Sequence, residues 1–151
     1  MANEAWSIAR GTVEDIDTVD RMSAQLHALE HIEIPATQRR HAINRLLCEE
    51  SLGGIWLIAH HGQVVGYIAL CRGFSIEFGG YDAVVDELFM QPEFRGSGGG
   101  RFALEAIKAE ASRLDIRALH LEVDRGNSNA RQLYEKVGFS ARDKYVLMTT
   151  G

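Results

Sequence analysis

The chain has 151 residues, of which 46% are hydrophobic and 25% are charged, and its formal net charge is −5. This balance is typical of a globular protein with its own core, so we expect one domain over residues 1–151. The negative charge argues against nucleic acid as the main partner, because phosphate contacts need clustered lysine and arginine.

The sequence also argues against a membrane or secreted protein. No uninterrupted apolar run approaches the roughly 20 residues needed to cross a bilayer. The first residues lack the basic and apolar regions of a secretory signal. Cys48 and Cys71 form neither a metal-ligand spacing nor a disulfide framework. These features favour a cytoplasmic protein.

Alternation and helical periodicity divide the first half of the chain into two β regions separated by two helices. The expected elements are a strand over 6–10, a helix from Thr12 to about His31, a helix from Thr37 to Gly53-Gly54, and β runs over 55–60 and 64–71. The turn residues His61-Gly62-Gln63 separate the last two runs, which predicts a hairpin.

In the second half, strands and helices alternate, which predicts an α/β fold. The expected elements are a buried strand over 84–90, a helix over 101–114, a strand over 118–123, a helix over 127–137, and a last β segment that opens at Phe139 and includes Tyr145 to Met148.

The most informative stretch runs from Arg95 to Gly100 and contains four glycines. It lies between the expected strand over 84–90 and the expected helix over 101–114. A glycine turn between a strand and a helix aims backbone N–H groups at a phosphate. We therefore expect a phosphate-bearing ligand at the start of that helix.

Three motifs together resemble the GNAT family of N-acetyltransferases. Arg95-x-x-Gly98-x-Gly100 is similar to the family's acetyl-CoA pyrophosphate loop, and Pro92-Glu93-Phe94-Arg95-Gly96 is similar to its frequent lead-in. Downstream, Asn127-x-x-Ala130-x-x-x-Tyr134-Glu135-Lys136-x-Gly138-Phe139 resembles the family's second signature. The resemblance implies a mixed central sheet of about six or seven strands flanked by about four helices.

The resemblance also implies acetyl-CoA as co-substrate, no metal, and direct attack by a primary amine in a ternary complex. The backbone around Leu88, Phe89 and Met90 would pair with the pantetheine arm. The implied pyrophosphate contacts are Arg95, Gly96, Ser97, Gly98, Gly99, Gly100 and Arg101, and Asn127 would bind the cofactor arm. The family usually has an aliphatic residue where this chain has Gly99, so we expect a more flexible loop.

The implied chemistry needs a proton acceptor for the amine and a proton donor for the departing thiolate. Asp86 and Glu87 are the candidate bases. Only one of them can face the cleft, because adjacent strand residues point to opposite faces and a bulge shifts that parity. Tyr134 is the candidate acid, because a phenol can hydrogen-bond or protonate a thiolate. A structural role remains the alternative for all three.

A small cationic amine is the expected acceptor, since acids gather where the family lines its acceptor pocket. The candidate acceptor-binding residues are Glu30, His31, Glu33, Glu77, Tyr81 and Asp82. His27 to His31 also match H-x-x-E-H, but nothing in the sequence supplies a third zinc ligand.

Two other functions remain open at the level of sequence. They are acetylation of a protein N-terminus or lysine, and non-catalytic binding of acyl-CoA. Family members often dimerise, so a homodimer is expected.

Overall fold

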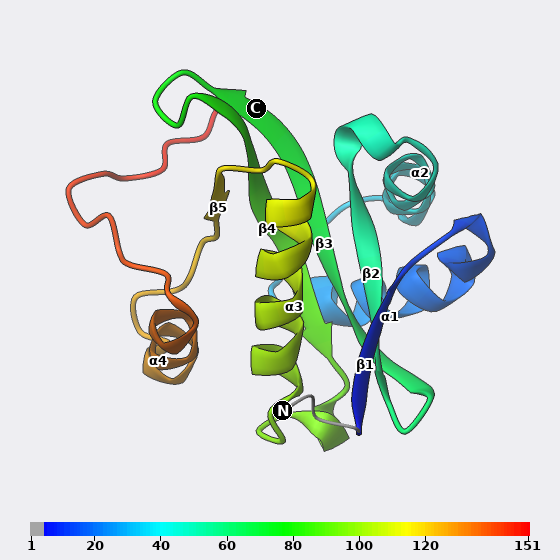
Figure 1. Ribbon diagram of the computed structural model, residues 1–151. Coiled ribbons are helices and arrows are strands. Elements are labelled where there is room, and N and C mark those ends of the chain that lie inside the picture. The colour runs from blue at the N-terminus through cyan, green and yellow to red at the C-terminus, as the bar shows by residue number, and fades with distance from the viewer. Residues whose placement is uncertain (1–4) are drawn as a thin grey trace.

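The computed structural model describes residues 5–151 and has a five-stranded sheet at its centre (Figure 1). The strands are β1 (Trp6–Arg10), β2 (Gly53–His60), β3 (Gln63–Ser75), β4 (Gly80–Met90) and β5 (Ala118–His120), and they lie in this order across the sheet. The first four are antiparallel to their neighbours, whereas β5 runs parallel to β4. The sheet is therefore mixed, as expected.

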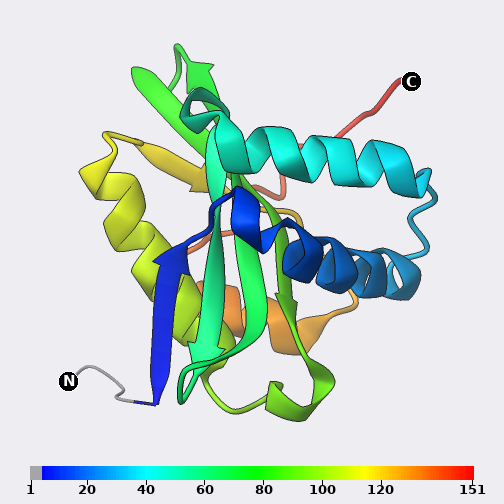
Figure 2. The same cartoon turned by 90° about the vertical axis from the view of Figure 1, so that its right-hand side faces the viewer.

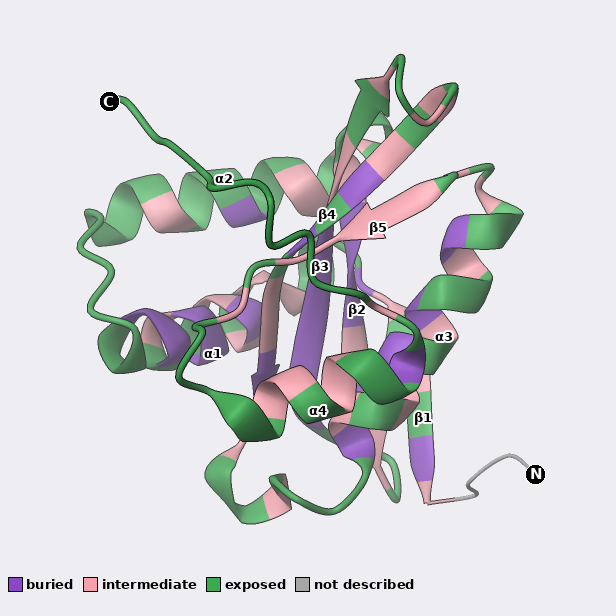
Figure 3. Cartoon of the chain, turned by 90° about the vertical axis from the view of Figure 1, so that its left-hand side faces the viewer, coloured by how far each residue is buried: buried purple, intermediate pink, exposed green. Residues whose placement is uncertain are grey.

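Helices cover both faces of the sheet. On one face lie α1 (Ile16–Leu29) and α2 (Ala36–Cys48), as Figure 2 shows. On the other lie α3 (Gly99–Arg113) and α4 (Ser128–Val137), as Figure 3 shows. Short 3₁₀ turns precede α1, β2 and α3. None of the helices in the described chain is long and apolar enough to cross a membrane.

Each face has its own hydrophobic core, because β3 is buried on both sides. Tyr67 and Ala69 pack with α1 and α2, whereas Ile68 and Leu70 pack with α3 and α4. The alternation of side chains along a strand produces this division. The other fully buried residues of the two cores include Val19 and Met22 on α1 and Leu104 and Ile107 on α3.

The expected count of six or seven strands was too high. The described chain has five strands, and residues 139–151 form neither helix nor strand. The apolar segment Tyr145 to Met148, expected to be a terminal strand, is exposed. The physical reason lies in β5, which ends after three residues and offers only a short edge for pairing.

Candidate functional site: a glycine loop beside a divided sheet

The glycine loop leaves the first turn of α3 open to an anion. Gly96 and Gly98 adopt left-handed backbone, with φ of 76° and 92°. Gly98 is the N-cap of α3, and no side chain caps that helix. A Cβ at either position would meet no atom within 4 Å. The first N–H groups of α3 therefore have no side-chain cap, and they lie at the positive end of the helix dipole.

Gly99 is required for a different reason, because it lies beneath the indole of Trp6. A Cβ at Gly99 would lie 2.5 Å from Trp6 Cη2 and 2.8 Å from Met90 Cε. Trp6 itself is only 5% exposed. Gly99 stands where the family usually has an aliphatic side chain. The apolar contact at this position is instead supplied by Trp6 of β1, near the N-terminus.

The remaining expected cofactor residues surround this loop. Arg95 Nε donates a hydrogen bond to the Met90 carbonyl oxygen at 3.0 Å, so Arg95 braces the loop against the end of β4. Ser97 and Arg101 are exposed on the loop and on the first turn of α3. Asn127 caps α4, since its Oδ1 accepts the N–H of Ala130 at 3.1 Å.

The sheet divides beside this loop. β4 and β5 pair only between Asp82–Val84 and Ala118–His120. Beyond Val84, the edge of β4 that faces β5 has no strand partner among the described residues. The backbone of Leu88, Phe89 and Met90 lies in this stretch. The N–H and C=O groups of this stretch that point away from β3, apart from the Met90 carbonyl held by Arg95, can pair with an extended ligand, as a neighbouring strand would.

A β-bulge at Asp86 sets which carboxylate faces which way. Ala69 pairs with Glu87, whereas its neighbour Leu70 pairs with Val85, so Asp86 is the extra residue on β4. A bulge bends the strand and re-aims the side chains beside it. Asp86 and Glu87 consequently have very different surroundings.

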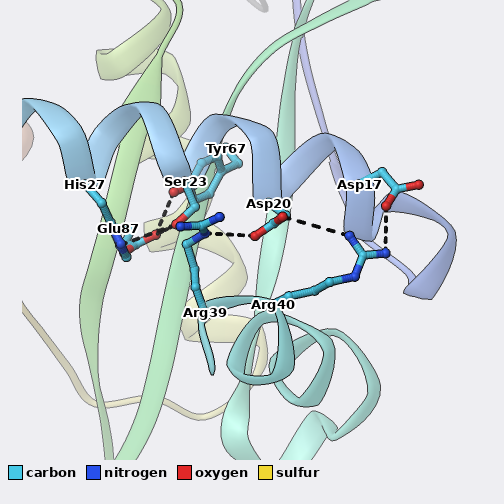
Figure 4. Close-up of polar contacts among 8 residues, drawn as sticks. All are labelled: Asp17, Asp20, Ser23, His27, Arg39, Arg40, Tyr67 and Glu87. Atoms are coloured by element: carbon cyan, nitrogen blue, oxygen red, sulfur yellow. Dashed lines mark hydrogen bonds and ion pairs between the residues drawn. The ribbon is translucent and has the colours of Figure 1, made fainter. Parts of the chain in front are cut away.

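Glu87 points toward α1 and is held by three donors (Figure 4). Its Oε1 accepts hydrogen bonds from Tyr67 Oη at 2.6 Å and from Ser23 Oγ at 3.0 Å. Its Oε2 lies 2.5 Å from His27 Nε2. All three partners are buried. Burial and the negative charge of Glu87 raise the pKa of Tyr67 well above its ordinary value, so this phenol stays a donor.

Asp86 has no hydrogen-bond or ion-pair partner among the described residues, and it reaches the surface. Partial burial of its carboxyl and the charges of Glu87 and Glu122 raise its pKa, while the charge of His27 opposes this rise. A raised pKa makes the Asp86 carboxylate a stronger base than an ordinary aspartate.

Tyr134 lies on the inner face of α4, packed against the core and edge-on to Phe139 with 6.2 Å between ring centroids. Burial and the charge of Glu30 raise its pKa. The Tyr134 phenol therefore holds its proton at neutral pH, as a general acid must. The effect of Glu30 also shows that the end of α1 lies within electrostatic range of α4.

The expected acceptor residues separate into two groups. Glu30, His31 and Glu33 are exposed where α1 gives way to α2. Glu77, Tyr81 and Asp82 lie instead toward the far end of the β3–β4 hairpin, and even Asp82 is five residues along β4 from Glu87, about 17 Å at the usual strand rise.

The hairpin group is engaged with other side chains. Glu77 pairs with Arg142 at 2.9 Å, and Asp82 Oδ2 lies 3.1 Å from His120 Nε2. Tyr81 lies under the Arg72 guanidinium, 4.0 Å from ring centroid to Cζ. Of the two groups, only the α1 end has a residue, Glu30, within electrostatic range of Tyr134.

Within residues 5–151, no group of three or more histidine, cysteine, aspartate or glutamate side chains is placed to hold a metal ion. His27 of the H-x-x-E-H match is bound to Glu87, and His31 lies beyond the end of α1.

Sequence reasoning missed four contributors to this site: Ser23, Tyr67, His27 as a Glu87 partner, and Glu122. The sequence did contain a signal for two of these residues, Ser23 and His27. Ser23 and His27 interrupt the apolar face of α1 that Met22 and Leu26 form. Polar residues on a buried face need a polar partner.

A hollow of about 920 Å³ lies between α3, β5, α4 and residues 138–147. It reaches Glu122 and Tyr134 but none of the glycine loop. It follows the outer side of β5, where the expected last strand does not form.

Residues 22–139 match the model of the acetyltransferase (GNAT) family. The chain belongs to the GNAT family. The match includes the second half of α1, strands β2 to β5, the glycine loop and α4, and it leaves out β1 with Trp6.

Two curated proteins are similar over part of the chain. An uncharacterized N-acetyltransferase, YhfO, of Bacillus subtilis is 28% identical over 61% of this chain and 62% of its own. An IAA acetyltransferase of Azospirillum brasilense is 36% identical over 56% of this chain and 52% of its own. The matches thus span between half and two thirds of these relatives.

Solved structures extend the likeness to nearly the whole chain. An integron cassette protein from the Cole Harbour salt marsh metagenome has a TM-score of 0.84 at 31% identity, covering 95% of this chain and 89% of its own. A predicted acetyltransferase from Clostridium acetobutylicum, solved with acetyl-CoA, has a TM-score of 0.78 at 18% identity, covering 95% and 96%.

A third structure is an aminoglycoside acetyltransferase from an uncultured soil metagenomic sample, solved with sisomicin. Its TM-score is 0.80 at 12% identity, covering 99% of this chain and 97% of its own. At this identity, and at that of the Clostridium protein, the likeness shows a common fold.

Proposed function

We propose that the chain transfers the acetyl group of acetyl-CoA to a primary amine of a small cationic molecule, by direct attack in a ternary complex. One observation supports this most. The open N-terminus of α3 and the unpaired edge of β4 lie next to each other in a GNAT fold. A ligand with a phosphate group and an extended amide arm fits this combination, and a fold neighbour was solved with acetyl-CoA.

Different segments of the chain would bind different parts of acetyl-CoA. The N–H groups of the loop from Arg95 to Arg101 would hold the pyrophosphate. The edge of β4 at Leu88–Met90 would pair with the pantetheine amides, and the Asn127 amide N–H₂ remains available as a donor, because only its Oδ1 caps α4. Acetyl-CoA supplies the acetyl group as an activated thioester.

Asp86 is the proposed base. An ammonium cannot attack a carbonyl, so the acceptor must lose a proton, either directly to the carboxylate or through water. Asp86 is unpartnered and its pKa is raised, whereas Glu87 is occupied by three donors. The nitrogen then forms the new C–N bond as the C–S bond breaks, and it gives up a second proton to water to become the neutral amide.

Tyr134 is the proposed acid for the sulfur that leaves. The sulfur departs as a thiolate, which accepts a proton or hydrogen bond from the phenol. The raised pKa of Tyr134 keeps that proton available. Across one turnover, Asp86 gains a proton and Tyr134 donates one, so exchange with solvent resets both groups.

The charge around the site supports a cationic acceptor. Asp86 lies within electrostatic range of Glu87 and Glu122, and Tyr134 lies within range of Glu30. Negative potential at an opening raises the local concentration of cations. His31 and Glu33 extend this surface at the α1 end. The aminoglycoside enzyme shows that the fold can accept such molecules.

Calorimetric titration with acetyl-CoA tests the proposal, with CoA and acetate as comparisons. Gly98→Ala and Gly62→Ala are matched variants. Both glycines have positive φ, 92° and 81°, and open space at the Cβ position, but Gly62 lies in the β2–β3 turn. Each substitution costs about 1–2 kcal/mol of backbone strain. We expect only Gly98→Ala to weaken acetyl-CoA binding, by about tenfold or more.

Turnover is then measured against a panel of polyamines, amino sugars and aminoglycosides. Asp86→Asn and Tyr134→Phe should each lower kcat by about 10²–10⁴ without weakening acetyl-CoA binding. Acetyl-CoA binding without turnover of any amine would favour the non-catalytic alternative. Absence of binding at millimolar acetyl-CoA would end the proposal.

We also propose a cytoplasmic homodimer. Large apolar side chains are exposed both on the β3–β4 hairpin and on the last segment, including Phe74, Ile76, Leu147 and Met148. The last segment meets the hairpin at Arg142, which pairs with Glu77 at 2.9 Å. Exposed apolar surface of this kind favours association. Sedimentation analysis would test it, and a monomer at micromolar concentration would contradict it.

A further inference from the structure

The Glu87 cluster is a buried polar group that the proposed reaction does not consume. It joins three elements: Ser23 and His27 from α1, Tyr67 from β3, and Glu87 from β4. Figure 4 shows both α1 side chains pointing at the carboxylate. Ser23 and Tyr67 are each 1% exposed, and His27 is 9% exposed. A buried carboxylate with this many donors is fixed in place.

Glu87 also fixes the imidazole. His27 Nε2 contacts Glu87 and also lies 3.4 Å from Ser23 Oγ, while Nδ1 is buried without a polar partner. The orientation of the imidazole ring therefore depends on the contacts that Nε2 makes. Because His27 and Ser23 are one helical turn apart, the same contacts fasten the last turns of α1 to the strand residue beside the bulge.

The neighbouring carboxylates of Asp86 and Glu87 thus differ in their hydrogen bonding. Glu87 is bound on both oxygens, and Asp86, displaced by the bulge, is bound on neither. If Glu87 were released from α1, two like charges on adjacent residues would compete for the same acceptor proton. The cluster prevents this competition.

We propose that the His27–Glu87 pair is a positioning unit that reserves Asp86 for the acceptor's proton. Glu87 remains bound to α1 and β3 throughout turnover, and His27 holds the Glu87 carboxylate on the α1 side, away from the acceptor. This inference rests on the proposed function, in which Asp86 is the base.

Several charged or titratable groups face Asp86. They are Glu87 on β4, His27 on α1, Glu122 in the chain that continues from β5, and Tyr67 and Cys71 on β3. Two of them lie in the pair and act in opposite directions: Glu87 raises the pKa of Asp86, and His27 lowers it. Burial and Asp86 raise the pKa of Cys71 to about 11, so this thiol stays neutral while Asp86 titrates.

Carboxyl ¹³C NMR titration of the protein without ligand tests the proposal. The aspartate carboxyl carbons are labelled, and the Asp86 signal is identified by its loss in Asp86→Asn. In Glu87→Gln, the pKa of Asp86 should fall, because a neighbouring negative charge is gone. In His27→Gln, the amide can still donate to Glu87 but the electrostatic effect of His27 that lowers the pKa of Asp86 is gone, so that pKa should rise.

Tyr67→Phe is the matched control. It removes one donor from the same carboxylate without changing any charge near neutral pH, so we expect no rise. A cluster that acted only as a brace would loosen in all three variants. Looser packing would let water reach Asp86 and lower its pKa each time. A fall or no change in His27→Gln, or no fall in Glu87→Gln, would overturn the proposal.

A kinetic readout completes the test. Once an acceptor is known, the acidic limb of kcat/KM against pH should move up in His27→Gln and down in Glu87→Gln. The NMR titration needs no acceptor and no acetyl-CoA. Opposite NMR shifts in a protein that acetylates nothing would leave the electrostatic pair standing and remove the proposed function.

Discussion

Replacing Gly99 with alanine tests whether β1 supplies the packing beneath the glycine loop. The new Cβ would lie 2.5 Å and 2.6 Å from two carbons of the Trp6 indole and 2.8 Å from Met90 Cε. Real Cβ contacts essentially never fall below 3.0 Å, so one of these groups must move. Trp6 cannot move cheaply, because it is a rigid ring buried in the core. Overpacking of this kind typically costs about 1–3 kcal/mol.

The second half of this experiment is a double-mutant cycle with Trp6→Leu, which removes the two indole carbons. In that background, Gly99→Ala should cost nothing, or stabilise by up to about 1 kcal/mol through helix propensity. The coupling energy from urea unfolding should therefore be about 1–3 kcal/mol.

Gly100→Ala is the matched control in the same helical turn. Its Cβ would meet only Leu133 Cδ2, at 3.5 Å, which is an ordinary contact. We expect no loss of stability at this position. An equal cost of Gly99→Ala with and without the indole would refute the reasoning and return Gly99 to the flexible loop expected from sequence.

Three further substitutions test individual interactions. The folded-state pKa of Asp86 lies above its ordinary 3.8, so the folded protein holds this proton more tightly than the unfolded chain does. The protein therefore loses stability as the pH rises from the ordinary pKa through the raised one. Asp86→Asn should be more stable than the wild type at pH 7 in thermal melts, and this gain should shrink below about pH 4. Lys108 Nζ donates to the Val137 carbonyl at 2.6 Å, and Lys108→Met should lower the free energy of unfolding by about 1.5–3 kcal/mol in urea titrations. Arg39 pairs with Asp20 at 2.8 Å between α2 and α1, and Arg39→Met should destabilise by no more than about 1 kcal/mol, with a smaller loss at 1 M salt.

The helices and most of the strands could be predicted because their signals are local. The 3.6-residue apolar period of α1 and the alternation over Trp6–Arg10 are complete within a few turns or residues. The last β segment shows the limit of this reasoning. Tyr145 to Met148 has strand-forming residues, but a strand needs a partner edge, and β5 ends at His120.

The site itself depends on contacts that no local pattern encodes. His27 and Glu87 lie 60 positions apart in the sequence, and Tyr67 lies 20 positions before Glu87. The sequence favoured Asp86 over Glu87 on strand parity but left both open, because strand parity is decided by where a bulge falls. The bulge is set by the pairing of β3 with β4, which is a property of the folded sheet.

One feature of the sheet, its division at Val84, explains why the loop, the bulge and the α1 end belong to one site. β5 leaves β4 there, so the rest of β4 has a free edge. The glycine loop continues directly from that edge, and the bulge at Asp86 lies within it. On a continuous sheet, a neighbouring strand would cover the backbone edge of β4 beside Asp86. The position of the division therefore leaves that edge open where we propose that acetyl-CoA and the acceptor meet.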